Sequence, residues 1–242
     1  MHKVGFIIYP AFSPMNLAVT SVFETANWKV GSAAYEVTLV SENGGPVATS
    51  LGYEIQTSSF QRRTFDTIIV GGGITAPAAT PGLLNYLRSA VHRSRRIASI
   101  CTGALVLAEA GLLDGRRATT HWHFARNMQR RYPKIAVEED RIFTIDGPIW
   151  TSAGMRAGVD LALALLAEDG CLSPSCGRAV AVLDVVGSGR GIRSHPDRTR
   201  LRERTFERAV VGSSIGTRRV SKTAAIRPTV QGGNGTVTRE GD

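Results

Sequence analysis

The sequence lacks long hydrophobic runs, and it contains only three cysteines in 242 residues. No apolar stretch reaches the roughly 18 residues that a membrane-spanning helix needs. The short apolar run after Lys3 lacks the length and the cleavage site of a signal peptide. An odd number of cysteines fits a reducing compartment better than a disulfide framework. These absences predict a cytoplasmic protein that does not contact membranes.

Excess positive charge is almost absent from the first two thirds of the chain. The formal net charge is +9 at neutral pH. Residues 171–242 carry 13 Lys and Arg against 6 Asp and Glu, whereas residues 1–170 carry 16 against 14. The basic excess therefore does not indicate a nucleic-acid surface on the folded part of the chain.

Large apolar residues and regular periodicity become rare after about residue 170. We expect one domain over residues 1–170, a short terminal element over 171–186 and a basic disordered tail over 187–242, because such a composition cannot offset the entropy cost of ordering. The tail is either a weak polyanion-binding segment or a solvated extension. Its abrupt change to Arg, Ser and Gly resembles a shifted reading frame in GC-rich coding DNA.

Residues 1–170 alternate between strand and helix patterns. Strands are predicted at 3–9, 35–41, 47–50, 53–57, 65–70, 97–100, 135–137, 142–145 and 149–152, and helices at 15–28, 81–91, 104–110, 124–132 and 154–168. This alternation predicts an α/β fold with a parallel sheet covered on both faces, in which ligands bind outside the carboxyl ends of the strands. Cys101, residues 71–73 and residues 9–10 all fall at the carboxyl ends of predicted strands, so we expect them to share one site.

A sharp change from strand to helix lies at residues 97–108. An apolar run rich in β-branched residues reaches Cys101, and a helix-like stretch without Pro or Gly begins at Ala104. Such a turn lifts the side chain out of the sheet, and the free N–H groups of a helix start lower the pKa of a thiol. The alternative is a buried structural cysteine, since free Cys is among the most buried residue types.

Three consecutive glycines at residues 71–73 follow another predicted strand. They either turn the chain or direct backbone N–H groups, those of Gly72 and Gly73, toward Cys101, where with the Thr102 N–H they would bind a developing oxyanion. The segment lacks the spacing of a dinucleotide fingerprint and the lysine of a phosphate-binding loop. No nucleotide or other cofactor is therefore predicted.

His121 lies 20 residues after Cys101, far enough for the chain to return beside the thiol. As a neutral imidazole it could take the thiol proton as a base. The alternative is a histidine of the core or the surface. His121 and His123 are also metal-ligand types, but a pair at i, i+2 without a third ligand does not indicate a zinc site.

Several segments carry a resemblance to a known family. They are Asp66-Thr67-Ile68-Ile69-Val70-Gly71-Gly72-Gly73, Ser99-Ile100-Cys101-Thr102-Gly103-Ala104, Gly111-Leu112-Leu113-Asp114-Gly115 with Thr120-His121-Trp122, and Thr151-Ser152-Ala153-Gly154. Together they span roughly residues 3–170 and resemble the ThiJ/PfpI family of the class I glutamine amidotransferase-like superfamily. The nearest form is the ligand-sensing half of AraC-type transcriptional regulators, and isonitrile hydratase is a near relative.

The resemblance implies a flavodoxin-like three-layer sandwich, a homodimer, and Cys101 as the elbow cysteine paired with His121. The sequence departs from the family at Asn16. Family enzymes usually place an acid after the first strand, an Asp in isonitrile hydratases, and this acid hydrogen-bonds the cysteine. Because an amide cannot shuttle a proton, Asn16 argues against hydratase and glyoxalase-type catalysis.

These features favour a binding module, namely the ligand-sensing domain of an AraC-type regulator, with a small amide- or nitrogen-containing metabolite bound near Cys101. No helix-turn-helix pattern follows in residues 187–242, so no DNA binding is expected from this chain itself. The alternative is a cysteine-dependent hydrolase or hydratase, in which Cys101 attacks an electrophilic carbon and His121 moves protons. A third hypothesis is redox sensing through oxidation of Cys101.

Overall fold

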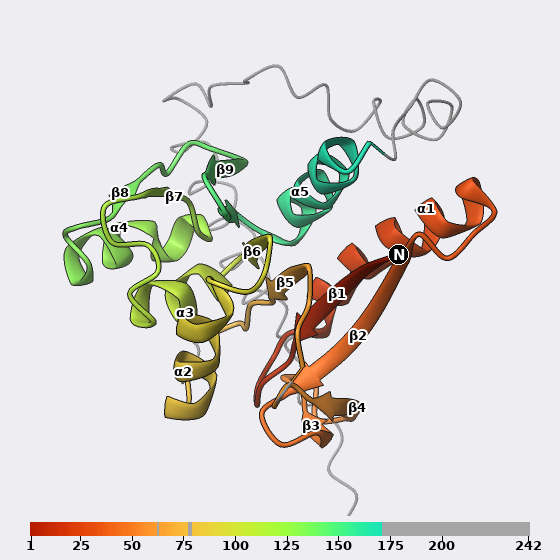
Figure 1. The fold of residues 1–242 in the computed structure, drawn as a ribbon. Helices are drawn as coiled ribbons and strands as arrows, with labels where there is room; N and C mark the ends of the chain where they lie inside the picture. The colour runs from red at the N-terminus through yellow and green to blue at the C-terminus, as the bar shows by residue number, and fades with distance from the viewer. Residues whose placement is uncertain (62, 77–78, 171–242) are drawn as a thin grey trace, which may run out of the picture. The chain divides into compact units, whose positions relative to one another are not determined.

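A computed structural model describes residues 1–61, 63–76 and 79–170, which Figure 1 draws in colour. Strands and helices alternate along this part of the chain, as the sequence pattern predicts. The terminal element predicted at 171–186 and the disordered tail predicted at 187–242 lie outside the described residues, and these two boundaries stay predictions.

Within the described residues, eight strands form one sheet in the order β3-β4-β2-β1-β5-β6-β10-β9. Their bounds are β1 His2–Ile7, β2 Tyr35–Ser41, β3 Gly45–Ala48, β4 Glu54–Ser59, β5 Thr67–Val70, β6 Arg96–Ile100, β9 Phe143–Asp146 and β10 Ile149–Ser152. Neighbouring strands from β4 to β10 run parallel, and the edge strands β3 and β9 run antiparallel. The predicted, mostly parallel sheet is confirmed, with one antiparallel strand at each edge.

The central strands are buried on both faces. Every residue of β5, β6 and β10 is buried, and β-branched and other apolar residues predominate in them. Near-continuous apolar runs are typical of parallel strands covered by helices on both sides. Apart from this sheet, β7 (Arg117–Ala118) and β8 (Ala136–Val137) form a short parallel pair.

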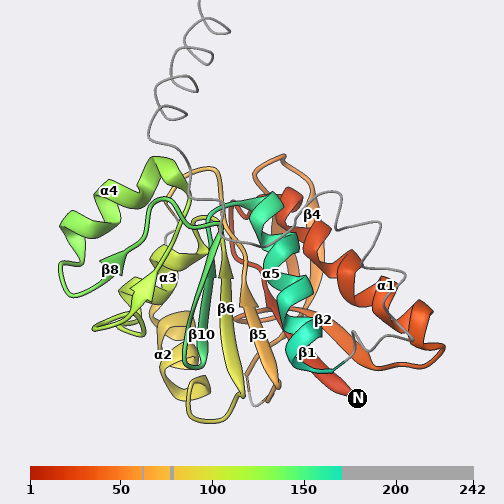
Figure 2. The same ribbon diagram turned by 90° about the horizontal axis from the view of Figure 1, so that it is seen from above.

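Helices cover both faces of the sheet, as Figure 2 shows. Their bounds are α1 Thr20–Val30, α2 Pro81–Ala90, α3 Gly103–Glu109, α4 Trp122–Arg131 and α5 Met155–Glu168. One apolar core joins the sheet to α2, α3 and α4, and a second core joins the other face to α1 and α5. This is the predicted flavodoxin-like three-layer sandwich. No helix in the described ranges is long and apolar enough to cross a membrane.

The segment predicted as one helix over residues 15–28 is divided in two. A 3-10 helix, η1 (Pro14–Val19), leads directly into α1. The Thr20 hydroxyl donates to the Leu17 carbonyl at 2.7 Å, across the junction between the two helices. The single-helix prediction is therefore wrong in its first turn, and this turn holds Asn16.

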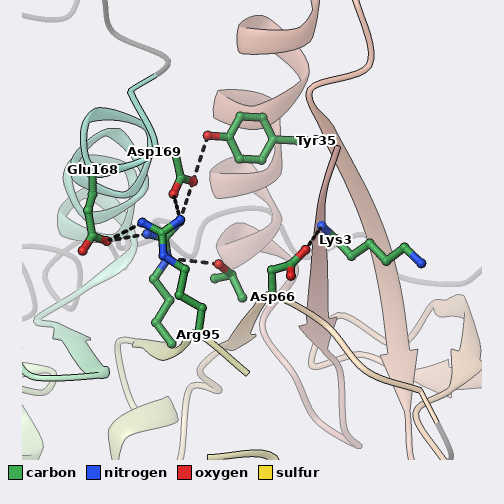
Figure 3. A network of polar contacts seen from close by, with 8 residues as sticks. Lys3, Tyr35, Asp66, Arg95, Glu168 and Asp169 are labelled. Atoms are coloured by element: carbon green, nitrogen blue, oxygen red, sulfur yellow. Dashed lines mark hydrogen bonds and ion pairs between the residues drawn. The ribbon is translucent and has the colours of Figure 1, made fainter. Parts of the chain in front are cut away.

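A buried arginine, Arg96, lies at the amino-terminal edge of the sheet and ties several strands to α5. Figure 3 labels its partners Glu168 and Asp169. Arg96, 3% exposed, begins β6. Its guanidinium donates to the Thr67 hydroxyl at 3.0 Å and pairs with Glu168 and Asp169 at the end of α5. Asp169 also accepts from the Tyr35 hydroxyl at 2.9 Å. This arginine network, defined by Arg96, Glu168, Asp169, Tyr35 and Thr67, fixes α5 to the edge opposite the predicted site.

Candidate functional site

Cys101 occupies a strained turn between β6 and α3. Its φ is +58°, in the left-handed region that non-glycine residues seldom adopt. The turn is held from two sides, because the Cys101 N–H donates to the Ser152 carbonyl at 3.1 Å and the Cys101 carbonyl accepts from the Thr120 hydroxyl at 3.0 Å. The predicted order of strand, sharp turn and helix is confirmed. Strain of this kind persists where the surrounding structure determines the backbone, as at many functional sites.

The thiol itself is not activated by its surroundings. Burial raises the pKa of the Cys101 thiol, and the backbone hydrogen bond from Thr102 opposes that shift only in part. The helix that follows has seven residues, Gly103–Glu109, so it supplies a short dipole. Desolvation therefore opposes the expected lowering of the thiol pKa, and the Thr102 N–H at the helix start acts in the expected direction without offsetting it.

The raised pKa predicts slow alkylation of Cys101. We expect the iodoacetamide rate at Cys101, followed by mass spectrometry of its peptide, to reach its half-maximum at a higher pH in the folded chain than in the same chain in denaturant. The reason is that only the thiolate reacts, and burial reduces its population at any given pH. A midpoint below that of the unfolded chain would instead indicate a stabilised thiolate.

The glycine segment, Gly71 to Gly73, packs directly against the elbow, which is the turn at Cys101 between β6 and α3. A side chain at Gly72 would place its Cβ 2.9 Å from the Cys101 Cβ and 2.8 Å from the Thr102 nitrogen, so only glycine fits there. The Gly73 N–H donates to the Thr102 hydroxyl at 2.8 Å, and that hydroxyl donates to the Gly73 carbonyl at 3.0 Å. Of the three predicted oxyanion donors, Gly73 is therefore already engaged, while the Thr102 N–H is directed at the sulfur.

Tyr9 also belongs to this site, although the sequence predicts only its place at the end of the first strand. Its buried hydroxyl donates to the Gly71 carbonyl at 2.7 Å. Burial, with the nearby Cys101 as a smaller cause, raises the pKa of Tyr9 far above its usual value, so the phenol stays neutral. Its position where β1 ends at the carboxyl edge of the sheet was the available signal.

Asn16 lies in η1 with its side chain against the glycine segment. Its amide nitrogen donates to the Ser13 carbonyl at 2.9 Å and to the Gly72 carbonyl at 3.0 Å. The residue is 2% exposed, and no hydrogen-bond donor of the described residues reaches its Oδ1. The structure thus brings Asn16, Gly72, Gly73, Thr102 and Cys101 together, as the sequence predicts for the carboxyl edge of the sheet.

His121 precedes α4 and caps its first turn. Its Nδ1 accepts from the His123 N–H at 3.3 Å, which places the proton of the neutral ring on Nε2. Burial and the neighbouring His123 lower the pKa of His121, so the neutral form is favoured. The preceding residue, Thr120, donates a hydrogen bond from its hydroxyl to the Cys101 carbonyl, and this bond ties the segment to the turn. In this tautomer Nε2 is a donor and the basic nitrogen, Nδ1, accepts from the His123 N–H, and the base role of His121 stays a prediction.

Metal-ligand types do not gather in the part of the chain that the structure describes. There, no group of three or more His, Cys, Asp and Glu side chains is arranged to hold a metal ion. Cys101 is a free thiol, and the other two cysteines, Cys171 and Cys176, lie outside the described residues. The polar groups near Cys101 are backbone, amide, hydroxyl and thiol groups.

Sequence comparison identifies relatives over this same domain. Residues 2–168 match the DJ-1/PfpI family. The HTH-type transcriptional regulator CdhR of Pseudomonas aeruginosa is 37% identical over 167 residues, which are 67% of this chain and 49% of the regulator. The isonitrile hydratase of Pseudomonas putida is 33% identical over 170 residues, 69% of this chain and 71% of that enzyme. The chain spans about half the length of the regulators it matches.

Structural comparison gives the same fold. The crystal structure of an AraC family transcriptional regulator from Pseudomonas putida superposes with a TM-score of 0.67. The two sequences are 23% identical, and the match covers 76% of this chain and 99% of that chain. The superposition supports the three-layer fold, and an identity of 23% carries no function with it.

Proposed function

The chain belongs to the DJ-1/PfpI family, and from this premise we propose that residues 1–170 are the ligand-sensing domain of an AraC-type transcriptional regulator. The observation that carries the proposal is the 37% identity to CdhR over 167 residues, a match confined to about half of that regulator. We assign to these residues a small-molecule site at Cys101 and no DNA contact. A homodimer, expected from the family resemblance, is part of the proposal.

The chemistry of the elbow supports binding over turnover. A nucleophilic cysteine needs a populated thiolate, whereas burial raises the pKa of Cys101. The residue beside the glycine segment is Asn16, and both amide protons of Asn16 are donated to backbone carbonyls. An amide in this state neither gives nor takes a proton, so it supplies no general acid or base.

Ligand binding without consumption tests the sensor proposal. We expect one compound in a panel of small amide- and nitrogen-containing metabolites to stabilise the chain, by about 2.7 kcal/mol at a hundredfold excess over Kd. Thermal unfolding measures the shift, and NMR of the recovered compound shows whether it is unchanged. The Cys101→Ser variant should bind with similar affinity. Conversion of the compound by wild type that stops in Cys101→Ser would overturn the sensor proposal in favour of an enzyme.

A second candidate function is cysteine-dependent hydration, which the 33% identity to isonitrile hydratase favours. The reaction would add water across an isonitrile to give an N-substituted formamide. We expect no formamide from wild type, because general acid–base assistance contributes about 10²–10⁴-fold and Asn16 lacks it. Asn16→Asp restores a carboxyl at this position and is the informative variant, with Cys101→Ser as its control. Formamide production by wild type at ordinary enzyme rates would support the hydratase instead.

A further inference from the structure

The amide of Asn16 can adopt only one orientation. Its nitrogen faces two backbone carbonyls, those of Ser13 and Gly72, at 2.9 and 3.0 Å. Turning the amide over would bring its oxygen against both carbonyls with no proton between them. Gly72 is held in turn, because its carbonyl also accepts from the Ser13 N–H at 3.0 Å. The Oδ1 of Asn16 must therefore point away from these groups.

Three donors around the elbow are already used within it. The Tyr9 hydroxyl donates to Gly71, and the Thr102 hydroxyl donates to Gly73. The Gly73 N–H donates to Thr102. Among the described residues none donates to Asn16 Oδ1, although the residue is 2% exposed. A buried acceptor without a donor is costly, so a donor brought by a ligand gains more here than at an exposed position.

We propose that Asn16 Oδ1 accepts a hydrogen bond from an N–H group of the bound ligand, so that this site selects neutral donor-bearing molecules such as amides. The inference rests on the sensor function proposed above and names the group that reads its ligand. Cys101 is the partly exposed member of this group, and Gly72 packs against Cys101 and accepts from Asn16, so a ligand that passes the thiol must displace this packing to reach Oδ1. A carboxylate or an ester oxygen at the same place would face Asn16 Oδ1 with a second acceptor and no proton between them.

Two probes that differ in one group test the inference on the full wild-type chain. N-methylpropionamide and methyl propionate have nearly the same shape, but the N–H of the first is an oxygen in the second. We expect the amide to bind at least about tenfold more tightly, because the ester leaves the acceptor unpaired. Propionate should bind no better than the ester. NMR titration gives the affinities, and shifts of the Asn16 side-chain amide and of Gly72 locate the binding.

Variants separate Asn16 from the rest of the site. In Asn16→Leu the preference for the amide over the ester should fall to near one, and the exposed Asn127→Leu should keep it. Because Asn16→Leu also removes two hydrogen bonds, the comparison of probes on wild type decides by itself if this variant fails to fold. Equal affinity of the two probes at the elbow would overturn the inference, as would no binding of the amide there. The sensor proposal is tested separately, by thermal unfolding with the panel of metabolites.

Discussion

Arg96→Met should lower the free energy of unfolding by about 3–5 kcal/mol, the range found when one partner of a buried ion pair is removed. Arg96 is 3% exposed, and the side chain of Asp169 is fully buried. Without the guanidinium of Arg96, the Asp169 carboxylate stays buried away from water and keeps only Arg95 as an ion-pair partner. The Thr67 hydroxyl and the face of Trp150, whose ring centre lies 5.7 Å from the Arg96 guanidinium carbon, lose contacts as well.

Arg95 provides a matched control for this result. It precedes Arg96 and pairs with the same Asp169, at 2.6 Å, but its side chain is 44% exposed. Arg95→Met should therefore cost no more than about 1 kcal/mol, as exposed pairs do. Chemical denaturation monitored by circular dichroism measures both variants. Equal losses for the two would show that burial of Arg96 does not determine its contribution.

A double variant separates lost attraction from the buried charge that is left behind. Asp169→Asn removes the charge and keeps an oxygen that can accept from the Tyr35 hydroxyl. The double variant should lose less stability than the sum of the two single losses, by about 1 kcal/mol or more, since contacting residues couple by about 0.5–3 kcal/mol. If the two losses were simply additive, the uncompensated carboxylate would not be the cause.

The elbow was predictable because its determinants are local. An apolar run that ends in Cys101, followed by Thr102 and Gly103, specifies both the end of a strand and the start of a helix. Parallel strands end at one edge, so the meeting of Asn16, Gly72 and Cys101 also follows from the order of elements. The fold was predictable for the same reason, since apolar residues predominate in the central strands and every residue of them is buried.

The electrostatics of the site could not be derived from the sequence. The thiol pKa depends on how deeply Cys101 is buried, and the helix start that favours the thiolate is visible in the sequence while the desolvation is not. The arginine network is a similar case. Arg96 and Asp169 are 73 residues apart, and only the packing of α5 on the sheet brings them together. The donor state of His121 likewise depends on a contact with the His123 backbone.

Gly103→Ala should be at least as disruptive as the loss of Arg96, for a steric reason. A Cβ at this position would lie 2.3 Å from the Val70 carbonyl oxygen and 2.9 Å from the Gly71 carbonyl oxygen. Both atoms belong to the backbone at the end of β5, so no side-chain rotation relieves the clash. Overpacking typically costs about 1–3 kcal/mol and occasionally more, and a contact with fixed backbone places this variant at about 3 kcal/mol or above.

The same substitution should also change the elbow, because α3 must move away from β5 to admit the methyl group. Thr102 then loses its contacts with Gly73, and the shielding of Cys101 falls. We therefore expect faster alkylation of Cys101 in Gly103→Ala at a given pH, together with the lower stability. Gly154→Ala is the control, since nothing lies within 4 Å of the added carbon and its φ of −165° suits any residue. Its stability should stay within about 0.5 kcal/mol of wild type. Similar behaviour of the two variants would mean that close approach of α3 to β5 does not set the geometry around Cys101.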